Sequence, residues 1–407
     1  MPDTALEVAA PRAASTPLGA GAVVIGAEYR ALGVVRSLGR AGIPVWVLAH
    51  GDDSLAVHSR FALRTFRLPE AENDRVDFLL MLAREHGLYG WALFPSGDET
   101  AALVARNHER LGELYALTTP SWDVLRWAYD KRLTHRLAES LAVDSPRTWY
   151  PAEQDDPAAG VAFPAILKPA IKPEFNRLTA AKAWRVDDAD ELRARYAEAA
   201  ELMSRDALLV QELLPGGGES QFSYAALCSD GRPLATILAR RTRQYPPDFG
   251  RASTYVESVE RPEIVEPSEQ VLADLRWDGL VELEYKQDPR DGRFKLLDIN
   301  PRAWGWHTLC ARAGVDFPVL AWRLAQGEAV PRLRGRAGVR WVRLSTDLPT
   351  SLKEILAGRM SAAEYLRSLR GPVEGAIYAR DDPRPGLLEL PLLARTLATR
   401  LARRGAV

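Results

Sequence analysis

The fold of this chain is decided by residues 279–302, which read GLVELEYKQDPRDGRFKLLDINPR. Apolar and polar residues alternate in both halves of this stretch, which predicts two strands, and the Asp-Pro-Arg-Asp-Gly run between them is rich in turn residues. We therefore expect an antiparallel hairpin that brings Glu284, Asp298 and Asn300 together. Oxygen ligands of this kind suit Mg²⁺, although an ordinary solvent-facing hairpin has the same pattern. The rest of the sequence has to separate these two interpretations.

Length and composition are those of a globular protein with more than one domain. The chain has 407 residues, too many for one core, and its formal net charge of -1 gives no reason to expect nucleic acid binding. Only Cys228 and Cys310 occur, which excludes a disulfide framework, and the scattered histidines argue against a zinc hydrolase. No apolar run is long enough to span a bilayer, and residues 1–20 read as a disordered tail, not a signal peptide. We therefore predict a cytoplasmic protein.

A strand–helix–strand unit follows this tail. Residues 22–27 predict a buried strand, 29–41 a helix and 43–48 a second strand, which implies a parallel sheet. The unit has no Gly-x-Gly-x-x-Gly, so the fingerprint of an NAD(P)-dependent enzyme is missing. Residues 91–95 predict a further strand that leads through Asp98 into a helix, a frequent place for ligands. A helix cap is an equally good explanation of Asp98.

The remaining chain alternates short strands with amphipathic helices. The predicted strands span residues 164–169, 208–215, 221–228, 233–239 and 341–344. We expect residues 221–228 and 233–239 to pair as a second hairpin. The predicted helices span residues 122–141, 187–204 and 308–324 (interrupted at Gly314), two short helices within 352–369, and a basic amphipathic helix over 387–404. We expect this last helix to pack on the body of the protein, and docking on an anionic membrane surface is the alternative.

Several charged and polar residues follow one another in a characteristic order. They are Asp130-Lys131, Lys168-Pro169, Gln211-Glu212-Leu213-Leu214 with Glu219, the arginines of 240–243, Glu284, and Asp298-x-Asn300-Pro-Arg302. This order resembles the ATP-grasp superfamily of carboxylate ligases over roughly residues 21–330. Residues 240–254, RRTRQYPPDFGRAST, make the chain most similar to the carbamoyl-phosphate-synthase-like and D-aspartate-ligase-like branch of carboxylate–amine ligases.

The resemblance implies a mixed α/β and α+β architecture, the ATP-grasp fold. In order along the chain, its parts would be the tail (1–20), a Rossmann-like pre-ATP-grasp domain (21–119), an ATP-grasp lid subdomain (120–205), a C-terminal ATP-grasp subdomain with the metal site (206–334) and a small C-terminal extension (335–407).

The resemblance also assigns roles around the phosphates of ATP. Lys131 and Lys168 would place compact charges against the phosphates, although a single lysine is more often a solvated surface residue. Glu284, Asp298 and Asn300 would bind one or two Mg²⁺ ions that bridge the phosphates, with Mn²⁺ as an alternative ion.

The nucleoside would lie against the strand that contains Gln211 and Glu212. In the family this strand is a hinge that reads the adenine edge, so Glu212 would accept from the exocyclic amine, with Leu213 and Leu214 near the ring. Glu219 would bind the ribose hydroxyls, and its alternative is a polar loop residue.

Arginines would bind the transferring phosphoryl group or the substrate carboxylate. Arg302 and one of Arg241 or Arg243 have suitable donors, although arginine clusters are usually solvated.

Two features of the sequence depart from the family. The glycine-rich lid that many members have after the lysine is missing, so Lys182 would contribute instead, and Asp298 stands where glutamate is commoner.

The function implied is that of an ATP-dependent, ADP-forming ligase. A small-molecule carboxylate would become an acyl phosphate, which an amine attacks to form an amide or peptide bond. One alternative is an NAD(P)-dependent enzyme built on the N-terminal domain, and a second is a non-catalytic or regulatory ATP-binding protein. The three retained metal ligands disfavour the second alternative. A homodimer is compatible with each interpretation.

Overall fold

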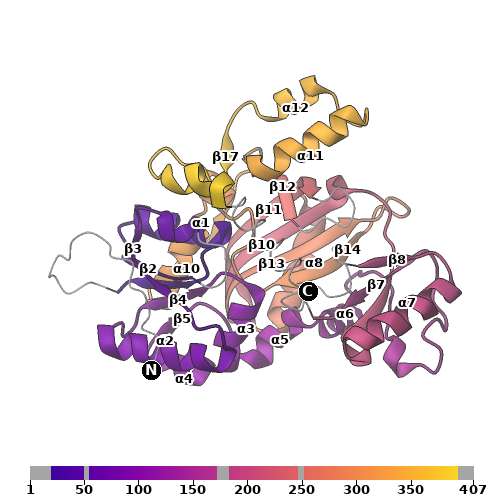
Figure 1. The fold of residues 1–407 in the computed structure, drawn as a ribbon, viewed down its shortest axis with the longest axis horizontal. Helices are drawn as coiled ribbons and strands as arrows, with labels where there is room; N and C mark the ends of the chain where they lie inside the picture. The colour runs from indigo at the N-terminus through magenta and orange to yellow at the C-terminus, as the bar shows by residue number, and fades with distance from the viewer. Residues whose placement is uncertain (1–19, 50–54, 172–182, 246–251, 393–407) are drawn as a thin grey trace, which may run out of the picture.

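The computed structural model describes residues 20–49, 55–171, 183–245 and 252–392 (Figure 1). Its N-terminal part is a parallel sheet with the strand order β3-β2-β1-β4-β5, which confirms the predicted strand–helix–strand opening. The elements are β1 (Ala22–Ile25), α1 (Tyr29–Arg40), β2 (Val45–Ala49), η1 (Ala56–His58), β3 (Ala62–Arg67), α2 (Glu72–His86), β4 (Ala92–Pro95), α3 (Asp98–Arg106), α4 (His108–Gly112) and β5 (Ala116–Leu117). Strands β1 and β4 form a topological switch point, where parallel sheets commonly bind ligands.

The second part is a smaller antiparallel sheet with the order β6-β9-β7-β8, which we call the lid. With the two helices that lead into it, its elements are α5 (Trp122–Tyr129), α6 (Lys131–Ser140), β6 (Thr148–Trp149), η2 (Pro151–Glu153), β7 (Ala165–Pro169), β8 (Trp184–Val186), α7 (Ala189–Leu202), η3 (Arg205–Ala207) and β9 (Leu208–Glu212). The helix predicted over 122–141 is two helices, because Asp130 has an extended backbone and caps α6 by accepting from the N–H of Arg132.

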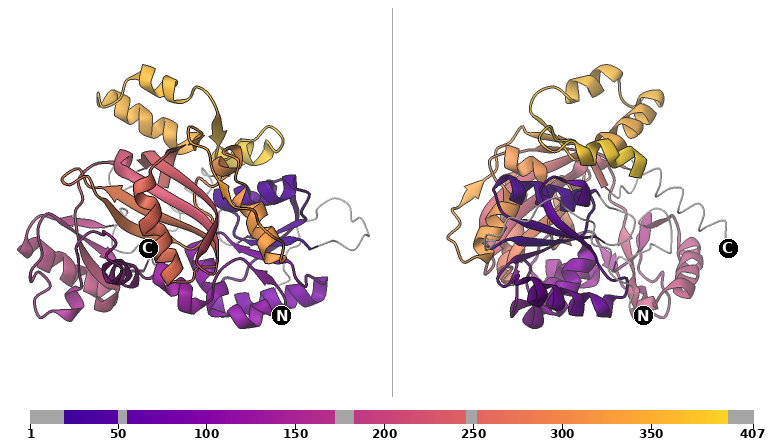
Figure 2. Two further views of the ribbon diagram at one scale, coloured as in Figure 1. Left: turned by 180° about the vertical axis from the view of Figure 1, so that it is seen from behind. Right: turned by 60° about the vertical axis from the view of Figure 1, so that its left-hand side comes forward.

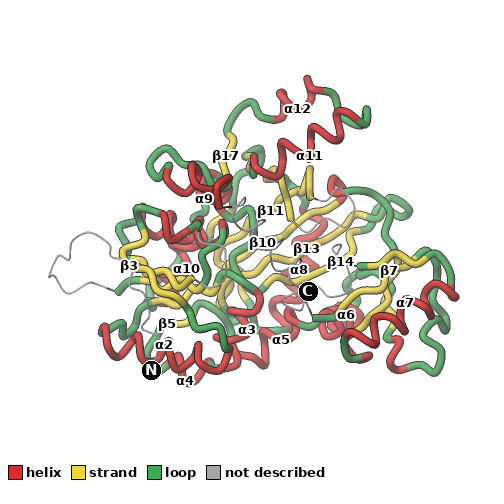
Figure 3. The backbone as a smooth tube through the Cα atoms, in the orientation of Figure 1, coloured by secondary structure: helices red, strands yellow, loops and turns green. Residues whose placement is uncertain are grey.

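The third part is the large central sheet, ordered β14-β13-β10-β11-β12-β16-β17 with β15 beside β11. Figure 3 shows its strands β14, β13, β10 and β11 side by side in yellow. Its strands are β10 (Gln221–Ser229), β11 (Arg232–Tyr245), β12 (Ala252–Ser258), β13 (Gly279–Gln287), β14 (Phe294–Asn300), β15 (Leu333–Arg334), β16 (Arg340–Val342) and β17 (Val373–Gly375). Its helices are η4 (Gly218–Ser220), η5 (Pro262–Ile264), α8 (Val265–Asp274), α9 (Thr308–Arg312), α10 (Phe317–Ala325), α11 (Leu344–Leu356) and α12 (Ala362–Ser368). Both predicted hairpins, β10–β11 and β13–β14, are confirmed.

Alternation of side chains divides the core between the two faces of the central sheet. Ala225 and Leu227 of β10 pack in one cluster with α1, α9 and α10, whereas Tyr224 and Ala226 pack in another with α8. The first cluster is continuous with the N-terminal sheet, so the two parts share one core. The left-hand view of Figure 2, like Figure 1, shows the central sheet between the lid and the N-terminal sheet.

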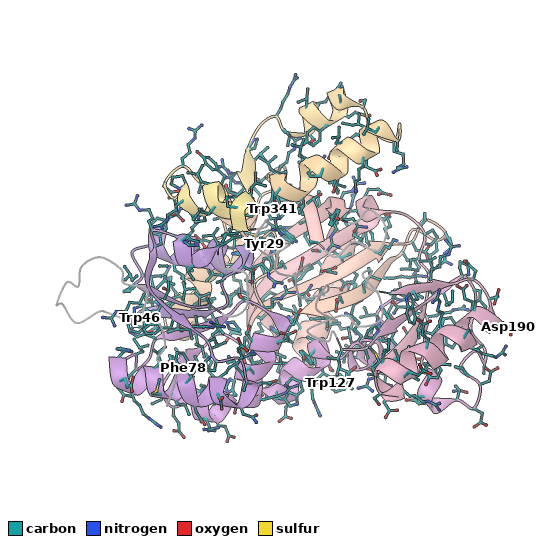
Figure 4. All side chains as sticks on the ribbon, in the orientation of Figure 1. Tyr29, Trp46, Phe78, Trp127, Asp190 and Trp341 are labelled. Carbon is teal, nitrogen blue, oxygen red and sulfur yellow. The ribbon has the colours of Figure 1, made fainter. Side chains whose placement is uncertain are left out.

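The C-terminal extension is fixed to both neighbouring parts. Figure 4 shows Tyr29, at the start of α1, beside Trp341 of β16, and their ring centroids are 6.4 Å apart. Asp382 is buried and accepts from Arg36 Nε of α1 over 2.9 Å. Of the helix predicted over 387–404, the structure describes residues up to 392, which form a helix over 384–392. None of the helices in the described ranges has the length and apolar character to cross a membrane.

Candidate active site

The hairpin β13–β14 places polar side chains on one face, and we call it the acidic hairpin. Glu284 lies opposite Asp298, and Asn300 lies opposite Glu282. Because side chains alternate along a strand, these four share a face, while Leu283 packs in the core on the other. Asn300 Nδ2 donates to Glu284 Oε1 over 2.8 Å. The hairpin that the sequence predicts is therefore present and brings the three predicted metal ligands to one place.

Two cations neutralise the two carboxylates of this predicted metal set. Lys131 Nζ, at the start of α6, forms an ion pair with Asp298 Oδ1. Arg241 Nη2 reaches from β11 to Glu284 Oε2 over 3.1 Å. All four side chains are less than a fifth exposed, so their charges are poorly screened. The resulting face offers positive charge next to oxygen ligands, as a polyphosphate with a divalent ion requires.

Arg302 connects the acidic hairpin to the switch point of the N-terminal sheet. Its Nη2 donates to Asn300 Oδ1 over 3.1 Å, and its Nε lies 3.0 Å from Asp98 Oδ1. Asp98 is the first residue of α3, and Gly97 occupies the cap position, so the explanation of Asp98 as a helix cap is wrong. Segments separated by about two hundred residues thus meet at one pocket, lined by Asp98, Ala128, Tyr129, Lys131, Ala170, Asp298, Ile299, Asn300 and Pro301.

Arg243 lies outside this face, so of the two alternative arginines only Arg241 stays a candidate. A regular strand would place both on one face, but the register of β11 against β12 shifts between them, which is a bulge. Arg243 Nε and Nη2 each donate over 2.8 Å to Asp347, and the guanidinium lies 4.0 Å from the centre of the Tyr255 ring. Arg243 is 8% exposed and Asp347 is fully buried. This ion pair ties the central sheet to α11.

Lys168 is held by a buried polar network in the lid. Its Nζ donates to Gln211 Oε1 over 2.7 Å, and Gln211 Nε2 lies 2.9 Å from His135 Nε2 and 3.0 Å from Thr148 Oγ1. Burial, together with the charges of Lys168 and Lys131, holds the pKa of His135 well below its ordinary value. His135 is therefore neutral and accepts from Gln211. The Gln211 side chain positions Lys168, and an adenine contact through it stays a prediction.

The hinge residues have partners that fix the loop after β9. Glu212 Oε1 and Oε2 accept from Lys295 and Arg290 respectively, each over 3.1 Å. Burial opposes ionisation of Glu212, but its bonds to Lys295, the backbone of Arg147 and Arg290 lower its pKa overall. Leu213 N donates to Pro164 O over 3.2 Å.

The carbonyl of Leu214 accepts from Lys286 Nζ over 2.9 Å, so a lysine of β13 holds the end of the hinge. Glu219 is exposed, and its Oε1 accepts from Gly217 N over 3.0 Å. The adenine and ribose contacts of Glu212, Leu213, Leu214 and Glu219 stay predictions. Lys182, predicted to replace the missing lid contacts, lies outside the described residues.

The chemistry of the acidic hairpin fits Mg²⁺ together with substrate oxygens. In the described ranges no three His, Cys, Asp or Glu side chains gather as a metal-binding group by themselves. The predicted set has two carboxylates and one amide, and Mg²⁺ is usually held by one or two carboxylates plus substrate phosphates. The residues present therefore suit a metal that arrives with a nucleotide.

Glu282 is a residue of this face that the sequence analysis missed. It is 3% exposed, and Trp306 Nε1 donates to its Oε1 over 2.8 Å while Asn300 Nδ2 donates to its Oε2 over 3.1 Å. Burial, with Glu284 beside it, raises the pKa of Glu282 to about 7. The signal in the sequence was its position two residues before Glu284, which puts both side chains on one face of the strand.

Known proteins resemble this chain in sequence and in structure. The family described as "ATP-grasp in the biosynthetic pathway with Ter operon" matches residues 204–345, which contain Arg241 and the acidic hairpin. A D-aspartate ligase of Enterococcus faecium (strain Aus0004) is 21% identical over 300 residues, which cover 69% of this chain and 70% of that protein.

Two solved structures show the same fold. An L-amino acid ligase from Bacillus licheniformis has a TM-score of 0.60 at 16% identity, covering 76% of this chain and 75% of its own. The biotin carboxylase domain of a Hydrogenobacter thermophilus 2-oxoglutarate carboxylase, in complex with MgADP, ADP and bicarbonate, has a TM-score of 0.61 at 16% identity, with coverages of 78% and 73%. The resemblance inferred from the sequence is thus confirmed: residues 204–345 match an ATP-grasp family, and the chain has the ATP-grasp fold in common with these ligases.

Proposed function

We propose that this protein is an ATP-dependent ligase that activates a carboxylate as an acyl phosphate and joins it to an amine. The observation that carries the proposal is the meeting of Glu284, Asp298 and Asn300 with Lys131 and Arg302 beside one pocket. ATP and one or two Mg²⁺ ions, or Mn²⁺, are the proposed cofactors. A cytoplasmic location, where ATP is abundant, belongs to the same proposal.

The proposed reaction has two steps. A carboxylate oxygen attacks the γ-phosphorus of ATP, the bond to the β,γ-bridging oxygen breaks, and ADP leaves with the electron pair. The amine nitrogen then attacks the acyl carbon, the carbon–oxygen bond to phosphate breaks, and the nitrogen loses a proton to give an amide and phosphate. Neither step needs a side-chain nucleophile.

This chemistry depends on positioning and on neutralising charge. The divalent ion, when bound, would neutralise phosphate oxygens, and Glu284, Asp298 and Asn300 would hold it. Lys131, Arg241 and Arg302 each contact one of these three ligands, so they would face the transferring phosphoryl group. The lid would exclude water, which protects an acyl phosphate from hydrolysis.

The substrate carboxylate would enter between the acidic hairpin and the switch point. Asp98 and Tyr129 line the pocket together with residues of the acidic hairpin, and Arg302 forms an ion pair with Asp98. Small-molecule carboxylates and amines are therefore the proposed partners. Membrane contact through residues 387–404 and a homodimer stay predictions.

The test is ADP release with ATP and Mg²⁺ across pools of amino acids, amino sugars and small carboxylic acids. We expect one pool to stimulate ADP release, and hydroxylamine to trap the acyl phosphate of its active component as a hydroxamate. Glu284→Gln should remove both signals while the circular dichroism spectrum is unchanged. Turnover of Glu284→Gln at the parent rate would reject the assignment of the metal site, and NAD(P) reduction without ADP release would reject the ligase.

A further inference from the structure

Glu282 is a buried carboxylate that the proposed reaction does not use. It lies on β13 opposite Asn300, and its two oxygens have different partners. Oε1 accepts from Trp306 Nε1 over 2.8 Å, and Oε2 accepts from Asn300 Nδ2 over 3.1 Å. Trp306 belongs to the core cluster that joins the N-terminal and central sheets. Glu282 therefore connects the buried core to Asn300, which lines the pocket.

The partners of Asn300 permit only one orientation of its amide. Nδ2 has two hydrogens, and it donates to Glu282 Oε2 and to Glu284 Oε1. Oδ1 accepts from Arg302 Nη2 over 3.1 Å. Exchanging the two atoms would set an oxygen against two carboxylates and an NH₂ group against a guanidinium. Both contacts would be repulsive, so the acidic side of the site fixes where Oδ1 points.

We propose that Glu282 is a positioning residue that holds the Asn300 amide with Oδ1 available to a divalent cation. This inference rests on the proposed function, because it takes Asn300 as a metal ligand. Glu284 also accepts from Asn300, but its Oε2 is paired with Arg241 and it is itself a proposed ligand. When an oxygen of Glu284 turns to the ion, Glu282 Oε2 still accepts the hydrogen bond from Asn300 Nδ2.

Glu282→Gln tests this role, because glutamine offers one acceptor where glutamate offers two. The indole N–H of Trp306 takes that acceptor, and the new NH₂ group then faces Asn300 Nδ2. The amide of Asn300 has to turn over, which withdraws Oδ1 from the cation. We expect Mn²⁺ binding in the presence of ADP, titrated by electron paramagnetic resonance, to weaken about ten- to a hundredfold, the usual effect of losing a partner behind a metal ligand.

Trp306→Phe provides a rescue that a general loss of stability would not give. Without the indole N–H, the glutamine oxygen is free to accept from Asn300, so Glu282→Gln/Trp306→Phe should bind Mn²⁺–ADP as Trp306→Phe does. In an Asn300→Ala background, Glu282→Gln should have no further effect. Parent-like binding by Glu282→Gln, or weaker binding by the double variant than by Trp306→Phe, would overturn the proposal.

The experiment also separates this inference from the proposed function. If the parent protein itself does not bind Mn²⁺ with ADP, the proposed function fails. If the parent and Glu282→Gln bind equally, only the positioning role fails. Should Glu282→Gln alone not melt cooperatively, the comparison of the double variant with Trp306→Phe decides the matter.

Discussion

Arg241 and Arg243 are two residues apart on β11, and we predict that replacing each by methionine damages a different property of the protein. Arg241 pairs with Glu284 of the acidic hairpin over 3.1 Å and is 11% exposed. Loss of one preorganised donor from such a site costs about 2.7–4 kcal/mol of transition-state stabilisation. We therefore expect kcat for Arg241→Met to fall about 10²–10³-fold, with a smaller loss of stability than for Arg243→Met, because Glu284 is partly exposed whereas Asp347 is fully buried.

Arg243→Met should instead destabilise the fold. Asp347 is fully buried and accepts from Arg243 twice over 2.8 Å, and from Thr254 Oγ1 once over 2.8 Å. Removing the arginine leaves a buried carboxylate without its cation, which costs about 3–5 kcal/mol. That is a large part of the stability of about 5–15 kcal/mol that proteins usually have. The kcat per folded molecule should not change, because Arg243 does not reach the acidic hairpin.

Two measurements on the same samples decide this prediction. Urea unfolding can be followed by tryptophan fluorescence, because the chain has 11 tryptophans, and activity by ADP release. Arg243→Met/Asp347→Leu is the matched control: it removes both buried charges, and it should recover most of the lost stability. The reasoning is refuted if Arg241→Met keeps the parent kcat, or if Arg243→Met loses kcat at full stability.

Three further predictions concern other parts of the structure. Burial lowers the pKa of His307 to about 4, so between pH 4 and 6.5 the unfolded chain binds a proton that the folded chain does not. The free energy of unfolding should therefore fall by about 3 kcal/mol as the pH drops through this range, and His307→Gln should make the urea midpoint depend less on pH. Asp382→Ala should lower the free energy of unfolding by about 3–5 kcal/mol, because it leaves the buried Arg36 without its carboxylate. Asp381→Ala removes an exposed ion pair and should lower it by under about 1 kcal/mol in the same urea titration. Equal losses in the two variants would contradict this prediction. Gln211→Leu removes the hydrogen bond that Lys168 donates to Gln211 Oε1, and a hydrogen bond to a charged group contributes about 1.5–3 kcal/mol. We therefore expect KM for ATP to rise about ten- to a hundredfold. An unchanged KM would show that Lys168 does not bind ATP.

The sequence predicted the parts of the site that depend on strand alternation. A period of two residues assigns Glu284, Asp298 and Asn300 to one face of a hairpin, and turn residues in a run of five predict where the chain reverses. The same signal predicted β10–β11. Local patterns of this kind are sufficient because neighbours in a hairpin are also neighbours in the sequence.

Features that depend on irregular backbone could not be predicted in this way. The bulge between Arg241 and Arg243 has no recognisable sequence pattern, so the alternation of side chains along a strand wrongly predicts that both arginines lie on one face. The break at Asp130 had a signal, since aspartate is a favoured cap, but the apolar spacing on both sides favoured one helix. Gln211 was predicted at the adenine edge, and its buried contacts with Lys168 and His135 arise from pairing between strands and a distant helix.

Glu282 and Glu284 show most clearly where sequence reasoning ends. They are the same residue type on one face of one strand, so no local pattern distinguishes their roles. Trp306, 24 residues beyond Glu282, makes the difference, because its indole holds Glu282 in the core while Glu284 pairs with Arg241. Trp306→Phe should therefore restore metal binding to Glu282→Gln but not to Glu284→Gln, in which a proposed ligand itself is altered. If Trp306→Phe restored metal binding to both variants, the two glutamates would have the same role, and the distinction drawn between them would be wrong.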